Sequence, residues 1–262
     1  MALLSHPARA YLGHLRKAGN RHDVHSPFVF KLVVDVLRKR TPLEGHAETE
    51  RLRSALLRDL RTITVTDLGA GSRSTNHSER RVRDIARTAL KPRRQAEQLA
   101  RITHYFNPRN VLELGTSLGI TTLYLARSVP EARVHTIEGC PAIATIAQEN
   151  FNARKTGNII PYVGSFSDQL PLVLDSMDSL DLAFLDGHHA AAPTLDYFER
   201  CLVKAHNDTV FVLDDIHWSE DMERAWAAIK AHPRVTVTID LYHFGIVFIR
   251  KEQQREDFVL RY

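Results

Sequence analysis

The chain has 262 residues, 44% of them hydrophobic and 25% charged, and 35 Lys and Arg against 31 Asp and Glu give a formal charge of +4. These proportions are ordinary for a globular protein and exclude a disordered or collagen-like chain. No apolar run reaches the roughly 18 residues that a membrane span needs, and His6 and Pro7 interrupt any secretory signal pattern. Two cysteines exclude a disulfide framework and a Cys-based zinc site, so we expect a cytoplasmic protein.

The charge is unevenly distributed along the chain. Residues 1–94 carry 20 Lys and Arg against 9 Asp and Glu, whereas residues 95–262 carry 15 against 22. The basic part either attracts an anionic partner or forms solvated helix faces, and the second interpretation is favoured. Because no aromatic-interleaved basic stripe or nucleic-acid motif is present, we do not expect a nucleic-acid partner.

The first third of the chain predicts helices separated by polar breaks. The expected helices are residues 8–18, 28–40, 48–61, 79–90 and 92–106. The polar segment from His22 to Phe28 either contributes to a binding site or begins a helix with Ser26 as its N-cap, and the cap is favoured.

From Asn110 onward, short apolar runs alternate with helical stretches. The expected strands are residues 111–114, 134–137, 159–163, 180–185 and 209–213, with helices beginning near Gly119, Pro141, Ser167, Pro193 and Ser219. This alternation is typical of a parallel sheet covered by helices. Residues 235–241 and 244–250 are joined too closely for a parallel crossover, so they form an antiparallel pair. We therefore expect an α/β, Rossmann-like sheet of seven strands, five parallel plus the C-terminal pair, in residues 93–262, and a mainly helical extension in residues 1–92.

Two glycine-rich turns could bind a cofactor, because each follows an apolar run and precedes a helix. One is Asp67–Ser72 and the other is Glu113–Gly119. Only the second is followed by a further strand ending in an acid, Glu138, which stands 23 residues after Gly115 and could hold ribose hydroxyls. We assign the cofactor to this turn and regard the Gly69/Gly71 turn as a structural loop or part of the substrate side.

The Glu113–Gly119 turn does not fit the Gly-x-Gly-x-x-Gly pattern of nicotinamide enzymes, because Ser117 and Ile120 stand at glycine positions. Together with Glu138 and the Gly164–Asp168 segment, it resembles motif I and the following motifs of class I S-adenosylmethionine (SAM)-dependent methyltransferases. The resemblance implies that Gly115 passes beside the methionine part, that Glu138 binds the ribose, and that Ser165 and Phe166 flank the adenine. The full set of cofactor contacts that it implies is Glu113, Gly115, Thr116, Ser117, Gly119, Glu138, Ser165, Phe166 and Asp186.

Three carboxylates follow the fourth and fifth expected parallel strands: Asp186, Asp214 and Asp215. Because ligands bind at the carboxyl ends of strands in open α/β sheets, we expect these side chains to converge. Like charges at close range are costly unless a cation joins them, and a hard divalent ion such as Mg²⁺ suits oxygen ligands. Alternatively, Asp186 caps the next turn or contacts the cofactor.

The Asp186–His189 segment and the doubled acid resemble metal-dependent small-molecule O-methyltransferases, the group that includes catechol and macrolide-sugar O-methyltransferases. The resemblance implies that His189 is the general base and that Asp186 takes part in catalysis. His188 is expected outside the reaction centre. His217 and Trp218 either line an acceptor pocket or, for Trp218, belong to the core.

These features predict SAM-dependent methylation of a hydroxyl on a small-molecule acceptor with the help of a divalent metal. A methyltransferase that acts on RNA or protein without metal is the alternative, and a non-catalytic SAM- or nucleotide-binding module is the alternative of another class. By the resemblance, residues 1–92 cover the acceptor or form a homodimer interface. The basic excess in this region favours an anionic acceptor.

Overall fold

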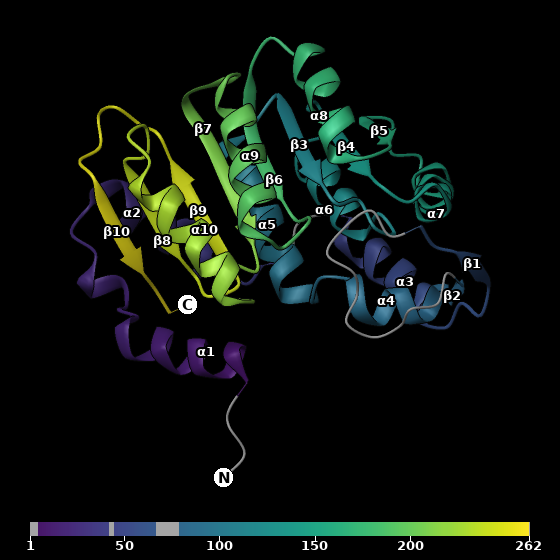
Figure 1. Ribbon diagram of the computed structural model, residues 1–262, viewed down its shortest axis with the longest axis horizontal. Coiled ribbons are helices and arrows are strands. Elements are labelled where there is room, and N and C mark those ends of the chain that lie inside the picture. The colour runs from purple at the N-terminus through teal and green to yellow at the C-terminus, as the bar shows by residue number, and fades with distance from the viewer. Residues whose placement is uncertain (1–4, 42–44, 67–78, 262) are drawn as a thin grey trace. The chain divides into compact units, whose positions relative to one another are not determined.

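The computed structural model describes residues 5–41, 45–66 and 79–261 (Figure 1). The chain divides into two compact units, of which unit 1 comprises Met1–Lys39 and Asp178–Tyr262 and unit 2 comprises Arg40–Met177. Both units combine helices with mostly parallel strands, which confirms the α/β class. The Asp67–Ser72 turn lies outside the described residues.

Unit 2 holds three parallel strands in the order β3-β4-β5. Its strands are β1 (Thr62–Thr64), β2 (Glu79–Arg81), β3 (Asn110–Leu114), β4 (Arg133–Glu138) and β5 (Ile159–Val163). Its helices are α3 (His46–Leu56), α4 (Val82–Ala89), α5 (Arg93–Phe106), α6 (Ile120–Ser128), α7 (Pro141–Ala153) and α8 (Phe166–Asp175). Helix α6 is buried almost throughout, because α3, α4, α5 and α7 contribute to one apolar cluster with it. This packing fixes the start of α6, where the predicted cofactor turn ends.

Unit 1 holds five strands in the order β10-β8-β9-β7-β6. They are β6 (Leu180–Leu185), β7 (Ala205–Asp214), β8 (Val237–Asp240), β9 (Phe244–Phe248) and β10 (Glu256–Val259). Its helices are α1 (His6–Lys17), α2 (Pro27–Leu32), a π-helical turn (Val33–Leu37), α9 (Ala191–Leu202) and α10 (Glu220–Ala231). Strands β6 and β7 are parallel, and β9 runs antiparallel to both β7 and β8. The reversed strand predicted from the short connection is therefore confirmed.

The N-terminal helices of unit 1 pack beside its C-terminal strands (Figure 1). Ser26 accepts a hydrogen bond from the backbone N–H of Val29 at 3.4 Å, so it caps α2 as predicted. The ring of Phe28 meets that of Phe248 in β9 edge to face, with 5.0 Å between the centroids. After α1, Gly19 pairs with Leu260 at the end of β10. The segment just after α1 and the start of α2 thus contact the last strands of the chain.

Three sequence expectations need correction. The helix expected over residues 79–90 begins only at Val82, because Glu79–Arg81 pairs with Thr62–Thr64 as an antiparallel ribbon. The helix expected over residues 28–40 changes to π-helical hydrogen bonding after Leu32.

The third correction concerns the number of strands. We expected seven, but the five strands of unit 1 and strands β3 to β5 of unit 2 make eight, and the additional strand is β10. Strand β10 pairs with β8 in parallel and has two exposed acidic residues, so its sequence lacks the apolar run of a buried strand.

Residues 1–92 are divided between the two units at Lys39 and Arg40, and their role as an acceptor cover or dimer interface stays a prediction. Among the residues that the structure describes, no helix has the length and apolar character to cross a membrane.

Candidate functional site

The turn between β3 and α6 has backbone angles that let a chain pass close to a ligand. Gly115 and Gly119 have φ values of 99° and 80°, a region that side-chain-bearing residues rarely adopt. A Cβ at Gly119 would lie 2.5 Å from the ring of Phe151, so the packing of α6 also requires glycine there. Ser117 adopts a positive φ of 47° between the two glycines. The turn is therefore wound tightly and leads directly into the N-terminus of α6, where helix N–H groups can bind an anionic or polar ligand.

Glu138, the last residue of β4, reaches back to this turn. One carboxylate oxygen accepts the backbone N–H of Ser117 at 2.8 Å, and the other accepts the N–H of Cys140 at 2.9 Å. Burial raises the pKa of the Glu138 carboxyl, while the N–H groups of Cys140, Ser117 and Gly139 act in the opposite direction. The hydroxyl oxygen of Ser117 is buried and has no hydrogen-bond partner among the described residues. The Glu138 carboxylate, which is predicted to hold a ribose, therefore lies next to Ser117, whose hydroxyl is unsatisfied.

Glu113 lies beneath the turn in β3 and is fully buried. Its carboxylate accepts hydrogen bonds from the hydroxyls of Thr122 and Thr136 at 2.5 and 2.7 Å. The hydroxyl of Thr136 also lies 2.6 Å from that of Thr116 in the turn. Glu113 and Thr116 therefore hold the turn against β4 and α6, a positioning role that the sequence did not reveal.

The segment after β5 is joined to the end of β4. Gly164 donates its backbone N–H to the carbonyl of Glu138 at 2.9 Å and has a positive φ of 144°. Ser165 caps α8 by accepting the N–H of Asp168 at 3.2 Å, and Phe166 is the first residue of the helix. The residues predicted to flank an adenine thus begin a helix directly beyond the Glu138 backbone.

A second group of candidate site residues lies at the strand ends of unit 1. Leu185 and Leu213 are paired in the parallel β6–β7 ladder, so Asp186 and Asp214 directly follow matched positions. One ligand atom from each of Asp186, His189 and Asp214 lies within 4.8 Å of the other two. This grouping brings together two of the three predicted metal ligands and the predicted base.

The backbone around this group is unusual. His188 and His189 have φ values of 65° and 22°, and Asp215 has 51°. Such conformations cost roughly 1–3 kcal/mol for residues other than glycine and gather at functional sites. Nε2 of His189 lies 3.7 Å from Oδ1 of Asp186, and Asp214 is only 2% exposed.

The other predicted residues of this region lie as follows. Asp215 is not part of the three-residue group, and its backbone N–H donates to the carbonyl of His243 at 2.9 Å. Nδ1 of His188 lies 3.2 Å from the hydroxyl of Tyr197, in keeping with a place outside the reaction centre. Trp218 is 42% exposed and therefore does not belong to the core.

His217, expected as a pocket residue, belongs to a different cluster with His14 and Asp240. No local sequence pattern indicates this cluster, because His14 and Asp240 are 226 positions apart.

Comparison with known proteins agrees with these features. Residues 112–216 match the profile of a family described as "Methyltransferase domain". The catechol O-methyltransferase of Niastella koreensis is 31% identical over 125 residues, which cover 47% of this chain and 56% of that protein. The catechol O-methyltransferase of Mycobacterium tuberculosis is 30% identical over 124 residues, which cover 47% of this chain and 54% of that protein. The chain thus spans about half the length of the curated relatives it matches.

A solved O-methyltransferase from Bacillus cereus, in complex with S-adenosylhomocysteine (SAH), superposes over 84% of this chain and 96% of its own, with a TM-score of 0.53 and 22% identity. This likeness shows that the fold is shared. The profile match covers β3, the glycine-rich turn, Glu138 and the strand ends at Asp186 and Asp214. Residues 112–216 therefore resemble a methyltransferase domain, and the chain is similar to catechol O-methyltransferases and shares the fold of a solved O-methyltransferase.

Proposed function

We propose that this chain is an O-methyltransferase that transfers the methyl group of SAM to a hydroxyl of a small-molecule acceptor with the help of a divalent cation. The observation that carries the cofactor assignment is the double hydrogen bond of Glu138, which ties the end of β4 to Ser117 and Cys140. A carboxylate that faces such a turn is placed to accept the hydroxyls of a ribose. The similarity to two catechol O-methyltransferases supports the acceptor class.

Asp186 and Asp214 fit a divalent cation by the chemistry of their donor atoms. Two carboxylates converge within 4.8 Å, and one of them is almost completely buried. Their mutual repulsion in a site of low dielectric is relieved by a cation, and carboxylate oxygens suit Mg²⁺. A bound cation would lower the pKa of an acceptor hydroxyl. Asp215 stays in the proposal as a ligand predicted from the sequence alone.

His189 is the proposed base that removes the acceptor proton. Its Nε2 lies 3.7 Å from Oδ1 of Asp186, beside the carboxylates proposed to hold the cation. The acceptor oxygen then attacks the methyl carbon of the sulfonium, the carbon–sulfur bond breaks with its electron pair on sulfur, and SAH leaves. Since the sulfonium already activates the methyl group, the chain needs to supply orientation and a base.

The test combines calorimetry with a methyl-transfer assay on the purified full chain. SAM should bind, and transfer to a panel of catechols and related hydroxyl compounds, neutral and anionic, should require Mg²⁺ and stop with EDTA. Asp186→Asn and Asp214→Asn should abolish metal-dependent transfer, and His189→Gln should lower its rate by roughly 10²- to 10⁴-fold. Asp196→Asn, which alters a half-exposed carboxylate paired with Arg200 on α9, is the matched control and should retain full activity.

Two results would refute parts of this proposal separately. Transfer that is unchanged by EDTA removes the metal and leaves the cofactor assignment in place. A chain that does not bind SAM or SAH under any metal condition removes the function altogether.

A further inference from the structure

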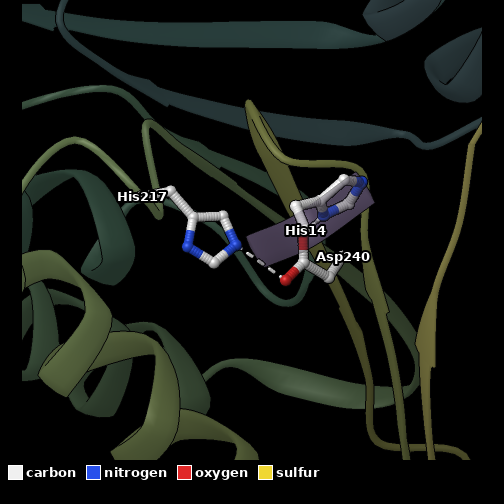
Figure 2. Close-up of side chains that lie close together, drawn as sticks. All are labelled: His14, His217 and Asp240. Carbon is white, nitrogen blue, oxygen red and sulfur yellow. Dashed lines mark hydrogen bonds and ion pairs between the residues drawn. The ribbon is translucent and has the colours of Figure 1, made fainter. Parts of the chain in front are cut away.

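A second cluster of metal-ligating side chains lies in unit 1, formed by His14 of α1, His217 and Asp240 of β8. One ligand atom from each lies within 4.8 Å of the other two. Figure 2 shows the imidazole of His217 pointing at the Asp240 carboxylate, with the ring of His14 on the other side of that carboxylate. The side chains of the three residues are 4%, 15% and 11% exposed. Two histidines and one carboxylate are thus almost shut off from solvent.

The histidine of α1 turns Nδ1 towards the Asp240 carboxylate, but this nitrogen lacks a well-aligned hydrogen bond. Nδ1 of His14 lies 3.1 Å from Oδ1 of Asp240. It is buried, and it has no partner with hydrogen-bond geometry in the part of the chain that the structure describes. A buried polar atom normally has such a partner, because desolvation without one is costly. A cation between His14 and Asp240 would satisfy this nitrogen.

Two of the three residues also make hydrogen bonds of the kind that orient metal ligands in proteins. Nδ1 of His217 lies 2.9 Å from Oε1 of Glu223 on α10, while Nε2 faces Asp240 at 2.8 Å. A metal-bound histidine characteristically gives its second ring N–H to a carboxylate, which fixes the tautomer and the orientation of the ring. Asp240 is oriented in the same way, because its Oδ1 accepts the backbone N–H of Tyr242 at 2.8 Å.

Charge and size both point to a divalent transition metal. With neutral imidazoles, Asp240 and Glu223 leave two negative charges to offset, which matches a divalent ion. Two imidazoles and one carboxylate suit Zn²⁺ better than the harder Mg²⁺. Ligands about 2.0–2.1 Å from a tetrahedral zinc are roughly 3.3 Å from each other. Here Nε2 of His217 lies 2.8 Å from Oδ2 of Asp240, and Nδ1 of His14 lies 3.1 Å from Oδ1, so each nitrogen–oxygen pair needs to separate by only a few tenths of an ångström.

From these observations we infer that His14, His217 and Asp240 form a zinc-class cation site, distinct from the Asp186 group, that fastens helix α1 to the C-terminal strands. The site joins the first helix to β8 and α10, beside the contact in which the Tyr242 hydroxyl donates to the carbonyl of Pro7 at 2.7 Å. Its role is structural, because it ties together segments from the two ends of the chain.

The test is zinc binding to the chelator-treated full chain, measured by calorimetry and by elemental analysis after desalting. The native chain and Asp186→Asn should both retain one tightly bound zinc, since the second variant removes only the other group. Glu223→Gln, which keeps all three ligands, should weaken this binding by roughly 10- to 100-fold. His14→Gln and His217→Gln should weaken it by more than Glu223→Gln does. His25→Gln, the same substitution at an exposed histidine near α2, is the control and should bind zinc as the native chain does.

Limited proteolysis gives a second readout that does not depend on activity. Zinc should slow tryptic cleavage after Arg16 and Lys17, which are exposed at the end of α1. This protection should be lost in Glu223→Gln at zinc concentrations that protect the native chain.

Either of two results on stably folded protein would overturn the inference. The first is a native chain that binds no zinc, in which case a shared proton holds the two histidines and Asp240 together. The second is one equivalent of zinc that disappears in Asp186→Asn and persists in His14→Gln.

Discussion

Removing the Glu138 carboxylate tests the cofactor site most directly. Glu138→Ala removes the carboxylate that accepts hydrogen bonds from two backbone N–H groups and, in the proposal, from the ribose hydroxyls. Hydrogen bonds to charged groups contribute about 1.5–3 kcal/mol each, and part of this loss falls on the turn itself. We therefore expect SAH affinity to fall by about 1–3 kcal/mol, which corresponds to roughly 5- to 150-fold.

The assay needs to separate ribose recognition from loosening of the turn. Calorimetry with SAH and with its 2′,3′-dideoxy analogue, on the native chain and on Glu138→Ala, forms a double-mutant cycle between the carboxylate and the hydroxyls. The native chain should bind the analogue more weakly than SAH, and Glu138→Ala should bind both alike. Glu131→Ala, at an exposed position just before β4, serves as the control for the same substitution. If the variant still discriminates between the two ligands as the native chain does, Glu138 does not contact the ribose.

Two further predictions concern the packing of unit 2. Gly119→Ala combines a positive φ of 80° with a Cβ placed 2.5 Å from the Phe151 ring, so urea unfolding should show that the free energy of unfolding falls by about 2–4 kcal/mol. Gly157→Ala, with no atom within 4 Å of the added Cβ, is the control and should change stability little. Equal losses in both variants would contradict the reasoning. Burial lowers the pKa of His46 to about 4, and both ring nitrogens lack hydrogen-bond partners among the described residues. Between pH 6.5 and about 4 the unfolded chain binds a proton that the folded chain does not, so stability should fall with falling pH by about 2–3 kcal/mol. His46→Leu should lose this part of the pH dependence in parallel unfolding titrations, and an unchanged pH profile would show that His46 is not the group responsible.

Local patterns were sufficient for most regular elements of the α/β sheet. The strands β3, β4 and β6 lie where short apolar runs predicted them, because a buried parallel strand has to be apolar on both faces. Strand β5 is also at its predicted place, whereas β7 begins at Ala205, four residues before the expected start. The reversed strand β9 followed from a connection too short for a crossover. The Glu113–Gly119 turn and Glu138 were identified from their spacing, since strand length and turn geometry fix the place where a second strand ends. The distinction between β2 and the start of α4 was not predictable, because it depends on pairing with Thr62–Thr64.

The sequence by itself determined the α/β class, the strand that carries Glu138, and the acids that follow β6 and β7, because each depends on residues close together in the chain. Only the tertiary structure decided which side chains meet. It placed His189 with Asp186 and Asp214, left Asp215 outside that group, and drew His217 to the other cluster. The pairing of His14 with Asp240 depends on packing between the first helix and a late strand, and hydrophobic periodicity carries no information about contacts between segments so far apart.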